Sequence, residues 1–362
     1  MTAAAVAVAG AEPDLIARRE GSAGIIRLNR PKAINAVTLE MFRDIDKALD
    51  AFEADPAVAV ILLEGAGERG LCAGGDIRAL YESSQVKGDL GKILWREEYI
   101  LNARIAKFAK PYVSFMDGIV MGGVVGLSAH SSHRVVTERT KLAMPEVGLG
   151  FFPDVGGTWL LARSPGEIGT YFGLTGQTMN GPDAVYAGFA DAVVPSGKLA
   201  ALREALTKQR PGVTAAEVTS LIAGFATGET SGPVAAIEPQ IDAWFGYDRM
   251  QDIVAALQAD SSELAQATLK TLNEKSPRGM VVALKLLRLA RASSSLEQCL
   301  VREYRAALEV FASDDFREGV RAAVIDKDRN PKWSPPRIED VTPEMVAPYF
   351  VEIGADELKF NQ

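Results

Sequence analysis

A continuous run of apolar residues, AVAVILLEG at positions 57–65, places the strongest constraint on the fold. A strand that is apolar on both faces must be covered on both sides, which is typical of the parallel sheets of α/β proteins. The alternating segment at residues 15–28 predicts a β-hairpin, and the apolar residues after Thr38 recur at helical spacing up to Asp55-Pro56. Strand, helix and strand in this order predict a βαβ unit.

The predicted elements change in type after residue 197. Before it, helices alternate with further strands, which we predict at residues 112–118, 132–138, 141–144 and 188–195. Ser164-Pro165-Gly166-Glu167 has the form of a capping box, which predicts a helix start. Beyond Lys198 only helical periodicity continues. We therefore predict a disordered N-terminal tail at residues 1–13, an α/β core at 14–197 and a helical C-terminal region at 198–362.

Composition narrows the classes of function. The formal net charge of -8 makes nucleic acid and anionic membranes unexpected partners, and no apolar run is long enough to span a membrane. The only cysteines, Cys72 and Cys299, imply no disulfide framework, which predicts a cytoplasmic protein. His130 and His133 have no neighbouring ligand residues, so we expect neither a metal site nor a Ser-His-Asp triad.

One short stretch, MPEVGLGFFPDVGG at residues 144–157, combines two carboxylates with apolar, glycine and proline residues. Glu146 and Asp154 would be poorly solvated there, so the pKa of each tends to rise toward neutral pH. Such a pair is typical of acid/base or nucleophilic catalysis. The alternative interpretation is local: Asp154 precedes a helical pattern and would then be an ordinary helix cap.

Two glycine-rich turns precede this stretch, at residues 73–76 (AGGD) and 121–123 (MGG). Backbone N–H groups of such turns can converge on one oxygen as an oxyanion hole, and glycine leaves room for the approaching substrate. The alternative is a pair of tight turns that bind no ligand. Cys72 stands beside the first turn, but without an evident base nearby we expect an inert buried thiol.

Four segments, in this order and spacing, resemble the enoyl-CoA hydratase/isomerase (crotonase) superfamily: LNRPKAINAVT, LCAGGDI, IVMGG and AMPEVGLGFFPDVGGTWLLAR. The resemblance covers about residues 14–330. It implies an α/β fold with a crotonase-like ββα spiral core and a helical C-terminal region, an acyl-CoA ligand and an oxyanion hole for the thioester carbonyl. On this pattern the oxyanion donors are the N–H groups of Gly75 and Gly123, with Gly74 and Gly122 as neighbouring substrate contacts.

The sequence departs from the hydratases at one position. Enoyl-CoA hydratases carry two catalytic glutamates, of which Glu146 matches the second, but the first falls at about Gly126, which has no side chain. The segments WREEY near residue 98, PE at 145–146, FPD at 152–154 and EGVRAAVIDKDRNPKW at 318–333 are instead similar to 3-hydroxyisobutyryl-CoA hydrolases.

This narrower resemblance implies hydrolysis of an acyl-CoA thioester, 3-hydroxyisobutyryl-CoA to 3-hydroxyisobutyrate and CoA, as in valine breakdown. It implies that Glu146 acts as nucleophile or as general base, and that Asp154 beside it places the substrate hydroxyl or the proton. Glu98 is expected to contact the acyl end; its alternative is a solvated charge on a helix. Two other functions stay open, a hydratase or isomerase acting through Glu146 alone and a non-catalytic acyl-CoA-binding relative.

The remaining expectations concern CoA and assembly. Coenzyme A is expected as part of the substrate rather than as a prosthetic group. The residues predicted to contact it are Lys32, Ala33, Ala73, Ile77 and Lys327. The resemblance also makes a homo-oligomer built through the C-terminal helices the expected state.

Overall fold

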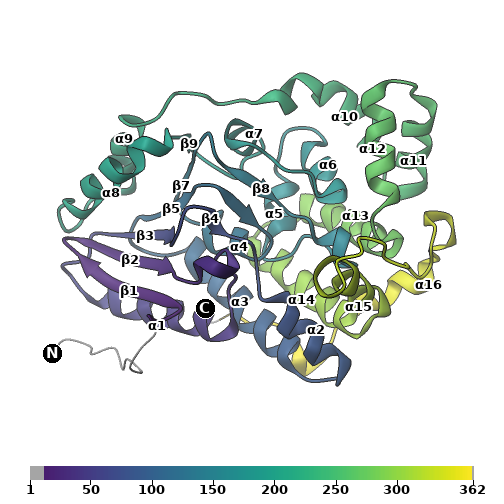
Figure 1. Ribbon diagram of the computed structural model, residues 1–362, viewed down its shortest axis with the longest axis horizontal. Helices are drawn as coiled ribbons and strands as arrows, with labels where there is room; N and C mark the ends of the chain where they lie inside the picture. The colour runs from purple at the N-terminus through teal and green to yellow at the C-terminus, as the bar shows by residue number, and fades with distance from the viewer. Residues whose placement is uncertain (1–11, 361–362) are drawn as a thin grey trace.

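A six-stranded sheet forms the centre of the computed structural model, which describes residues 12–360 (Figure 1). Its strands, in spatial order, are β1 (Leu15–Glu20), β2 (Ala23–Leu28), β3 (Val60–Gly65), β5 (Tyr112–Met116), β7 (His133–Val136) and β9 (Ala192–Val193). β1 and β2 form the predicted antiparallel hairpin, and every later pairing is parallel. In the run at residues 57–65, predicted to be buried, positions 58 to 64 are buried, and Ala57 and Gly65 at its two ends are half-buried.

A second sheet of three short parallel strands carries the chain to the functional region. It consists of β4 (Gly70–Cys72), β6 (Ile119–Met121) and β8 (Lys141–Ala143). Each of these strands follows a strand of the large sheet directly, so the chain repeats strand, strand and helix. This repeat confirms the predicted α/β class and the ββα spiral. Residues 119–121, expected only as part of a turn, form β6 instead.

The helices up to residue 197 fill the repeats between strands. They are α1 (Leu39–Ala54), α2 (Ile77–Gln85), α3 (Leu90–Ala106), α4 (Val124–Ser128), α5 (Gly157–Leu161), α6 (Ile168–Thr175) and α7 (Gly181–Tyr186). The side chain of Thr38 caps α1 by accepting a hydrogen bond of 3.3 Å from the Met41 amide. The apolar face of α1, including Phe42, Ile45 and Leu49, is buried against the sheet, as its spacing predicts.

The predicted capping box at residues 164–167 is wrong. The helix there begins at Ile168, and the Ser164 hydroxyl donates to the carbonyl of Ala187 at 2.8 Å instead of capping it. The Glu167 carboxylate is turned away to pair with Arg288 at 3.0 Å and Arg291 at 2.6 Å. These charge-assisted contacts come from a helix more than a hundred residues away, which a local motif cannot reveal.

The rest of the chain is helical, as predicted. Its α-helices are α8 (Leu199–Thr207), α9 (Ala215–Ala223), α10 (Glu238–Phe245), α11 (Met250–Ala259), α12 (Glu263–Asn273), α13 (Pro277–Arg291), α14 (Leu296–Ala312), α15 (Asp314–Val320) and α16 (Pro343–Val346). α8 and α9 cover one face of the large sheet, and α13, α14 and α15 pack against α3, α5, α6 and α2 (Figure 1). Residues before and after position 197 therefore contribute to the same hydrophobic cores. The domain boundary at residue 197 stays a prediction.

Two predictions concern the ends of the chain and membranes. Most of the N-terminal tail predicted at residues 1–13 lies outside the described residues. Among the helices that the structure describes, none is long and apolar enough to cross a membrane.

Candidate active site

The two glycine turns lie side by side because they follow neighbouring strands of the small sheet. β4 and β6 are parallel, so their carboxyl ends meet at one edge. Gly74 (φ +108°) and Gly122 (φ +60°) adopt backbone conformations that favour glycine. The amides of Gly75 and Gly123 donate no hydrogen bond to any group within residues 12–360. Two adjacent, unused N–H groups provide the donors that an oxyanion hole requires.

Glu146 lies beside the second turn because β8 pairs with β6. It begins the 3-10 turn Glu146–Leu149, directly after β8, and a Cβ at position 122 would lie 3.0 Å from its Oε1. Both carboxyl oxygens are buried and accept no hydrogen bond from the described residues. Burial, followed by the charge of Asp154, raises the pKa of Glu146 well above its ordinary value. An unpartnered carboxyl group in this position is available to a substrate or a water molecule.

Asp154 is held by a tyrosine from another helix. The hydroxyl of Tyr99, on α3, donates to Asp154 Oδ2 at 2.7 Å. Burial raises the pKa of Asp154 to about 7, although the Tyr99 hydrogen bond favours the ionised form and opposes that rise. The interpretation of Asp154 as a helix cap is wrong, because α5 begins at Gly157 and its cap residue is Gly156.

Glu98 brings a third carboxyl group to the second glycine turn. It projects from α3 and is only 3% exposed, so its interpretation as a solvated helix charge is wrong. A Cβ at position 123 would lie 2.8 Å from its Oε1, which places this oxygen close to a proposed oxyanion donor. Burial first, then the charges of Asp154 and Glu146, raise the pKa of Glu98 well above its ordinary value.

Among residues 12–360 no group of three His, Cys, Asp or Glu side chains is arranged to hold a metal ion.

These groups line one cavity of about 210 Å³. Its apolar wall includes Trp95, Phe151 and Phe316, and the rings of Trp95 and Phe151 stack at 5.3 Å between centroids. Phe316, on α15, and Val324 show that the C-terminal region closes the cavity. The small volume and aromatic wall suit a short acyl group with polar atoms at one end.

Asn102 fills the space beside Gly126. A Cβ at position 126 would lie only 2.6 Å from Asn102 Oδ1. This chain therefore has no counterpart of the first hydratase glutamate at position 126, and Asn102 leaves no room for one. The Asn102 amide is buried and finds no hydrogen-bond partner among the described residues.

The residues predicted to contact CoA fall into two groups. Ala73 and Ile77 line the cavity beside Gly74 and Gly75. Lys32 and Ala33, in the 3-10 turn Pro31–Ala33, and Lys327 do not line it. The structure thus brings the glycine turns and carboxyl groups together and leaves these three residues outside the cavity.

Cys72 is buried beside the first turn and acts as part of its scaffold. Its sulfur accepts a hydrogen bond from the Gly74 amide at 3.2 Å, and burial raises the pKa of the thiol to about 12. A thiol that stays protonated at neutral pH is a poor nucleophile. The expected burial of this thiol is confirmed, and its inertness stays a prediction.

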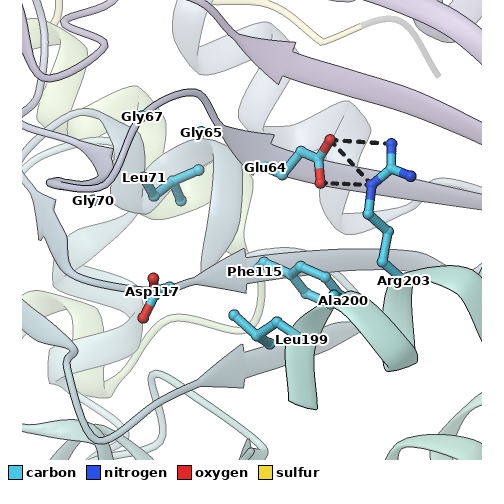
Figure 2. A pocket seen from close by; sticks show the side chains of 10 residues that line it. All are labelled: Glu64, Gly65, Gly67, Gly70, Leu71, Phe115, Asp117, Leu199, Ala200 and Arg203. Carbon is cyan, nitrogen blue, oxygen red and sulfur yellow. Dashed lines mark hydrogen bonds and ion pairs between the residues drawn. The ribbon is translucent and has the colours of Figure 1, made fainter. Parts of the chain in front are cut away.

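A separate cavity of about 190 Å³ lies between the large sheet and α8 (Figure 2). Two carboxylates line it, Glu64 and Asp117, and Glu64 is paired with Arg203 at 3.0 Å and with Arg27 at 2.6 Å. The oxygens of Glu64 are thus occupied by charge-assisted hydrogen bonds. This cavity shares no lining residue with the cavity at the glycine turns.

Sequence reasoning missed Tyr99, the aromatic wall and Glu303. Trp95 precedes Glu98 by three positions on α3, so helical spacing places it on the same face once Glu98 is known to face inward. Tyr99 is the next residue along the helix, and only its hydrogen bond to Asp154 reveals its part in the site. Glu303 interrupts the apolar face of α14, a signal visible in the sequence. Phe316 reaches the cavity only through tertiary packing.

Comparisons with known proteins agree with this geometry. A family profile described as enoyl-CoA hydratase/isomerase matches residues 23–350. The 3-hydroxyisobutyryl-CoA hydrolases named mitochondrial from Mus musculus and Homo sapiens are 40% and 38% identical, over 96% and 97% of this chain and 91% and 92% of theirs. The word mitochondrial in these names runs against the predicted cytoplasmic location, and the compartment of this chain stays a prediction.

Solved structures extend the match to the fold. A carnitinyl-CoA dehydratase from Mycobacterium thermoresistibile has a TM-score of 0.90 at 42% identity, covering 96% of this chain and 99% of that chain. An enoyl-CoA hydratase from Rhodobacter sphaeroides has a TM-score of 0.89 at 40% identity, covering 96% of this chain and all of that chain. With the paired glycine turns and the ββα spiral, these similarities establish that the chain belongs to the enoyl-CoA hydratase/isomerase (crotonase) superfamily.

Proposed function

We propose that this protein hydrolyses an acyl-CoA thioester, 3-hydroxyisobutyryl-CoA, to 3-hydroxyisobutyrate and CoA. The observation that carries the proposal is the Glu146 carboxyl group, which is buried and unpartnered beside the unused amides of Gly75 and Gly123. The names of the curated relatives supply the substrate. The small aromatic-walled cavity fits its short acyl group.

The first step uses the two amides and Glu146. The N–H groups of Gly75 and Gly123 bind the thioester oxygen and stabilise the negative charge that develops on it, each donor contributing about 3 kcal/mol. Ionised Glu146 then has two routes. It attacks the carbonyl carbon and expels the CoA thiolate, leaving a mixed anhydride that water cleaves, or it removes a proton from a water molecule that attacks directly. Both routes consume one water and release one acid and one thiol.

The other carboxyl groups orient the substrate. In this proposal Asp154, held by Tyr99, accepts a hydrogen bond from the 3-hydroxyl group or shares the proton of Glu146. Glu98, which lies beside the second turn, contacts the acyl end. When protonated, a buried carboxyl group donates a hydrogen bond as well, so each can serve a hydroxyl group in either direction.

Isotope labelling tests whether a mixed anhydride forms on Glu146 and is opened at the carboxyl carbon of that residue. Single turnover in H₂¹⁸O, with enzyme in excess over substrate, labels the Glu146 carboxyl group if a mixed anhydride is opened by attack of water at the enzyme's carbonyl carbon. Mass spectrometry of the peptide containing Glu146 detects the label. General-base catalysis places the label in the product acid alone, as does an anhydride opened at the carbonyl carbon of the substrate, so a labelled Glu146 is the outcome that establishes the anhydride route.

A hydratase is the second candidate, and it is favoured by the similarity to two solved proteins named as a carnitinyl-CoA dehydratase and an enoyl-CoA hydratase. Addition of water across a double bond by paired carboxylates needs a second glutamate near position 126, where this chain has Gly126 packed against Asn102. The pocket therefore favours the hydrolase. A non-catalytic acyl-CoA-binding protein is disfavoured by the free oxyanion donors.

The test measures both reactions on one preparation. Thiol release from 3-hydroxyisobutyryl-CoA is followed beside loss of enoyl absorbance from crotonyl-CoA. We expect rapid thiol release and no hydration. Hydration without thiol release would replace the hydrolase proposal with the hydratase.

Two further properties accompany the proposal. Every polar group used in the proposed hydrolysis belongs to the chain, the acyl-CoA substrate or water, so we expect no prosthetic group. We also expect a homo-oligomer, and light scattering of the purified protein measures the number of subunits.

A further inference from the structure

Glu303 is a fully buried carboxyl group that lies outside the catalytic cavity. It sits on α14 with 0% exposure, within an apolar face that includes Leu296, Leu300 and Ala307. α14 packs against α3 and α5, the helices that flank the site. A buried carboxyl group is costly unless hydrogen bonds satisfy it, so its partners indicate why it is there.

All the partners of Glu303 lie in the turn that follows Asp154. The Gly156 amide donates to Oε2 at 2.7 Å, and the Thr158 amide donates to Oε1 at 3.2 Å. The Thr158 hydroxyl also donates to Oε1. Both oxygens are thus occupied by the start of α5, and no group from elsewhere in the described chain shares them.

This turn has a backbone conformation that needs support. Val155 has φ +53° and Gly156 has φ +75°. A β-branched residue at positive φ is a genuine outlier, and such residues persist only where their surroundings hold them. Val155 is the residue next to Asp154, so relaxation of this conformation would move the Asp154 carboxylate.

One peptide group is held at both ends. His130 Nε2 lies 2.8 Å from the Val155 carbonyl oxygen, while Glu303 accepts from the Gly156 amide of the same peptide bond. Burial lowers the pKa of His130 to about 4, so the neutral ring donates to the carbonyl from Nε2 near neutral pH. The two side chains therefore fix the orientation of the peptide directly after Asp154.

We infer that Glu303 is a positioning residue for the reaction, holding Asp154 in place through the Val155–Gly156 peptide and the start of α5. The inference rests on the proposed function, because it assigns Asp154 a role in that reaction. Through Glu303, the C-terminal helix α14 supports the geometry of the site, although it does not contact the substrate.

The test compares three substitutions in the full-length protein. Glu303→Gln keeps the shape of the side chain but replaces one acceptor oxygen with a donor, which opposes at least one of its present partners. Thr158→Val removes only the hydroxyl group that donates to Glu303. Glu309→Gln, at an exposed position on the same helix, is the matched control.

We expect Glu303→Gln to lower kcat about 10- to 100-fold for 3-hydroxyisobutyryl-CoA, because misplacement of a reacting group by about 1 Å can cost about 100-fold. KM should change less than about threefold, since the cavity wall is untouched. Thr158→Val should lower kcat by a smaller factor, and Glu309→Gln should match the wild type. Unchanged kcat in folded Glu303→Gln protein, or a rise in KM alone, would overturn the inference.

Two readouts separate this inference from the proposed function. Wild-type thiol release, measured in the same assay, tests the function by itself. A crystal structure of Glu303→Gln, or of Thr158→Val if the first variant does not fold, tests the positioning without any turnover. We expect the Val155–Gly156 peptide and the Asp154 carboxylate to be displaced, and an unmoved Asp154 would contradict the inference.

Discussion

At the scale of single residues, the site is defined by three buried carboxyl groups, Glu98, Glu146 and Asp154, whose pKa values are all raised. Asp154 has a pKa of about 7, and its charge contributes to the raised pKa values of Glu146 and Glu98. Near neutral pH the ionisation of Asp154 therefore opposes the ionisation of Glu146 and Glu98. The protonation states of the three groups are therefore coupled, and Glu146 is the group that must be ionised to attack or to accept a proton.

The first prediction concerns the pH dependence of hydrolysis. Activity that needs ionised Glu146 rises with pH through the raised pKa of that group. Asp154→Asn removes a negative charge that raises this pKa, so the acid limb of kcat/KM should move to lower pH. The plateau should also fall about 100-fold, because a group that orients the substrate or the proton is lost. Rates between pH 5 and 9 check this expectation, and a limb at the wild-type position would contradict it.

The second prediction concerns stability. A carboxyl group whose pKa is raised on folding binds its proton more tightly in the folded state, so it lowers stability as pH rises from the unfolded pKa toward the folded one. Glu146 behaves in this way and has no hydrogen-bond donor among the described residues to offset its burial. Glu146→Gln should therefore raise Tm relative to wild type, with a larger gain at pH 8 than at pH 5. Each unit of pKa difference corresponds to about 1.4 kcal/mol.

Thermal unfolding at several pH values measures this difference. Glu309→Gln serves as the control, since its side chain is exposed. A gain in Tm that is the same at every pH would show that the titration of Glu146 is not its source.

At the scale of elements, the sequence predicts long segments well and short ones poorly. The hairpin, the Thr38-capped helix α1 and the buried strand β3 have enough residues for their periodicity to show. β4, β6 and β8 have three residues each, too few for an alternating pattern. The sequence pattern predicts only β8 among them, as the strand at residues 141–144, and the ββα arrangement follows from family resemblance alone. The false capping box at Ser164 shows the same limit, because distant arginines decide where Glu167 points.

The residues of the candidate site also differ in how far the sequence alone predicts them. Glu146, Asp154 and both glycine turns stand out locally, and the structure brings them to one cavity. Glu98 depended on resemblance, because a charge on a helix is ordinarily exposed. Phe316 and Glu303 could not be placed, since their relation to the site arises from the packing of α14 and α15 on the core.

The third prediction concerns the contact between α3 and α4. Gly126→Ala should lower the free energy of unfolding by about 1–3 kcal/mol, because the new methyl group would lie 2.6 Å from Asn102 Oδ1. Asn102→Ala in the same chain should restore most of that loss. Denaturant unfolding of both single variants and the double variant forms the measurement.

A fully additive result would contradict this account of the contact. Coupling between the two positions would support it. Coupling would also mean that a hydratase-like glutamate at position 126 requires removal of Asn102.

At the scale of the whole molecule, the C-terminal helices complete the catalytic cavity. Phe316 and Val324 form part of its wall, and Glu303 supports the Asp154 turn. α8 and α9 bury Leu202, Leu206, Val218 and Ile222 against the large sheet. The spiral core alone would therefore expose apolar surface and leave the cavity open on one side.

The fourth prediction concerns selectivity for acyl length. Phe316→Ala should enlarge the cavity, so kcat/KM for a longer 3-hydroxyacyl-CoA should rise about 10-fold relative to that for 3-hydroxyisobutyryl-CoA. The substitution should also cost about 3–5 kcal/mol of stability, because Phe316 is fully buried. Competition between the two substrates measures the ratio. Phe108→Ala, which is outside the cavity wall, should leave the ratio unchanged, and an equal ratio in both variants would contradict the assigned wall.

The most direct test of the central claim is thiol release from 3-hydroxyisobutyryl-CoA by Glu146→Gln, with substrate binding measured on the same preparation. The substitution keeps the shape of the side chain and the oxyanion donors while removing the nucleophile or base. We predict loss of kcat by about 10²- to 10⁴-fold, with the CoA ester still bound. Turnover at the wild-type rate would contradict the assignment of Glu146 and with it the proposed mechanism.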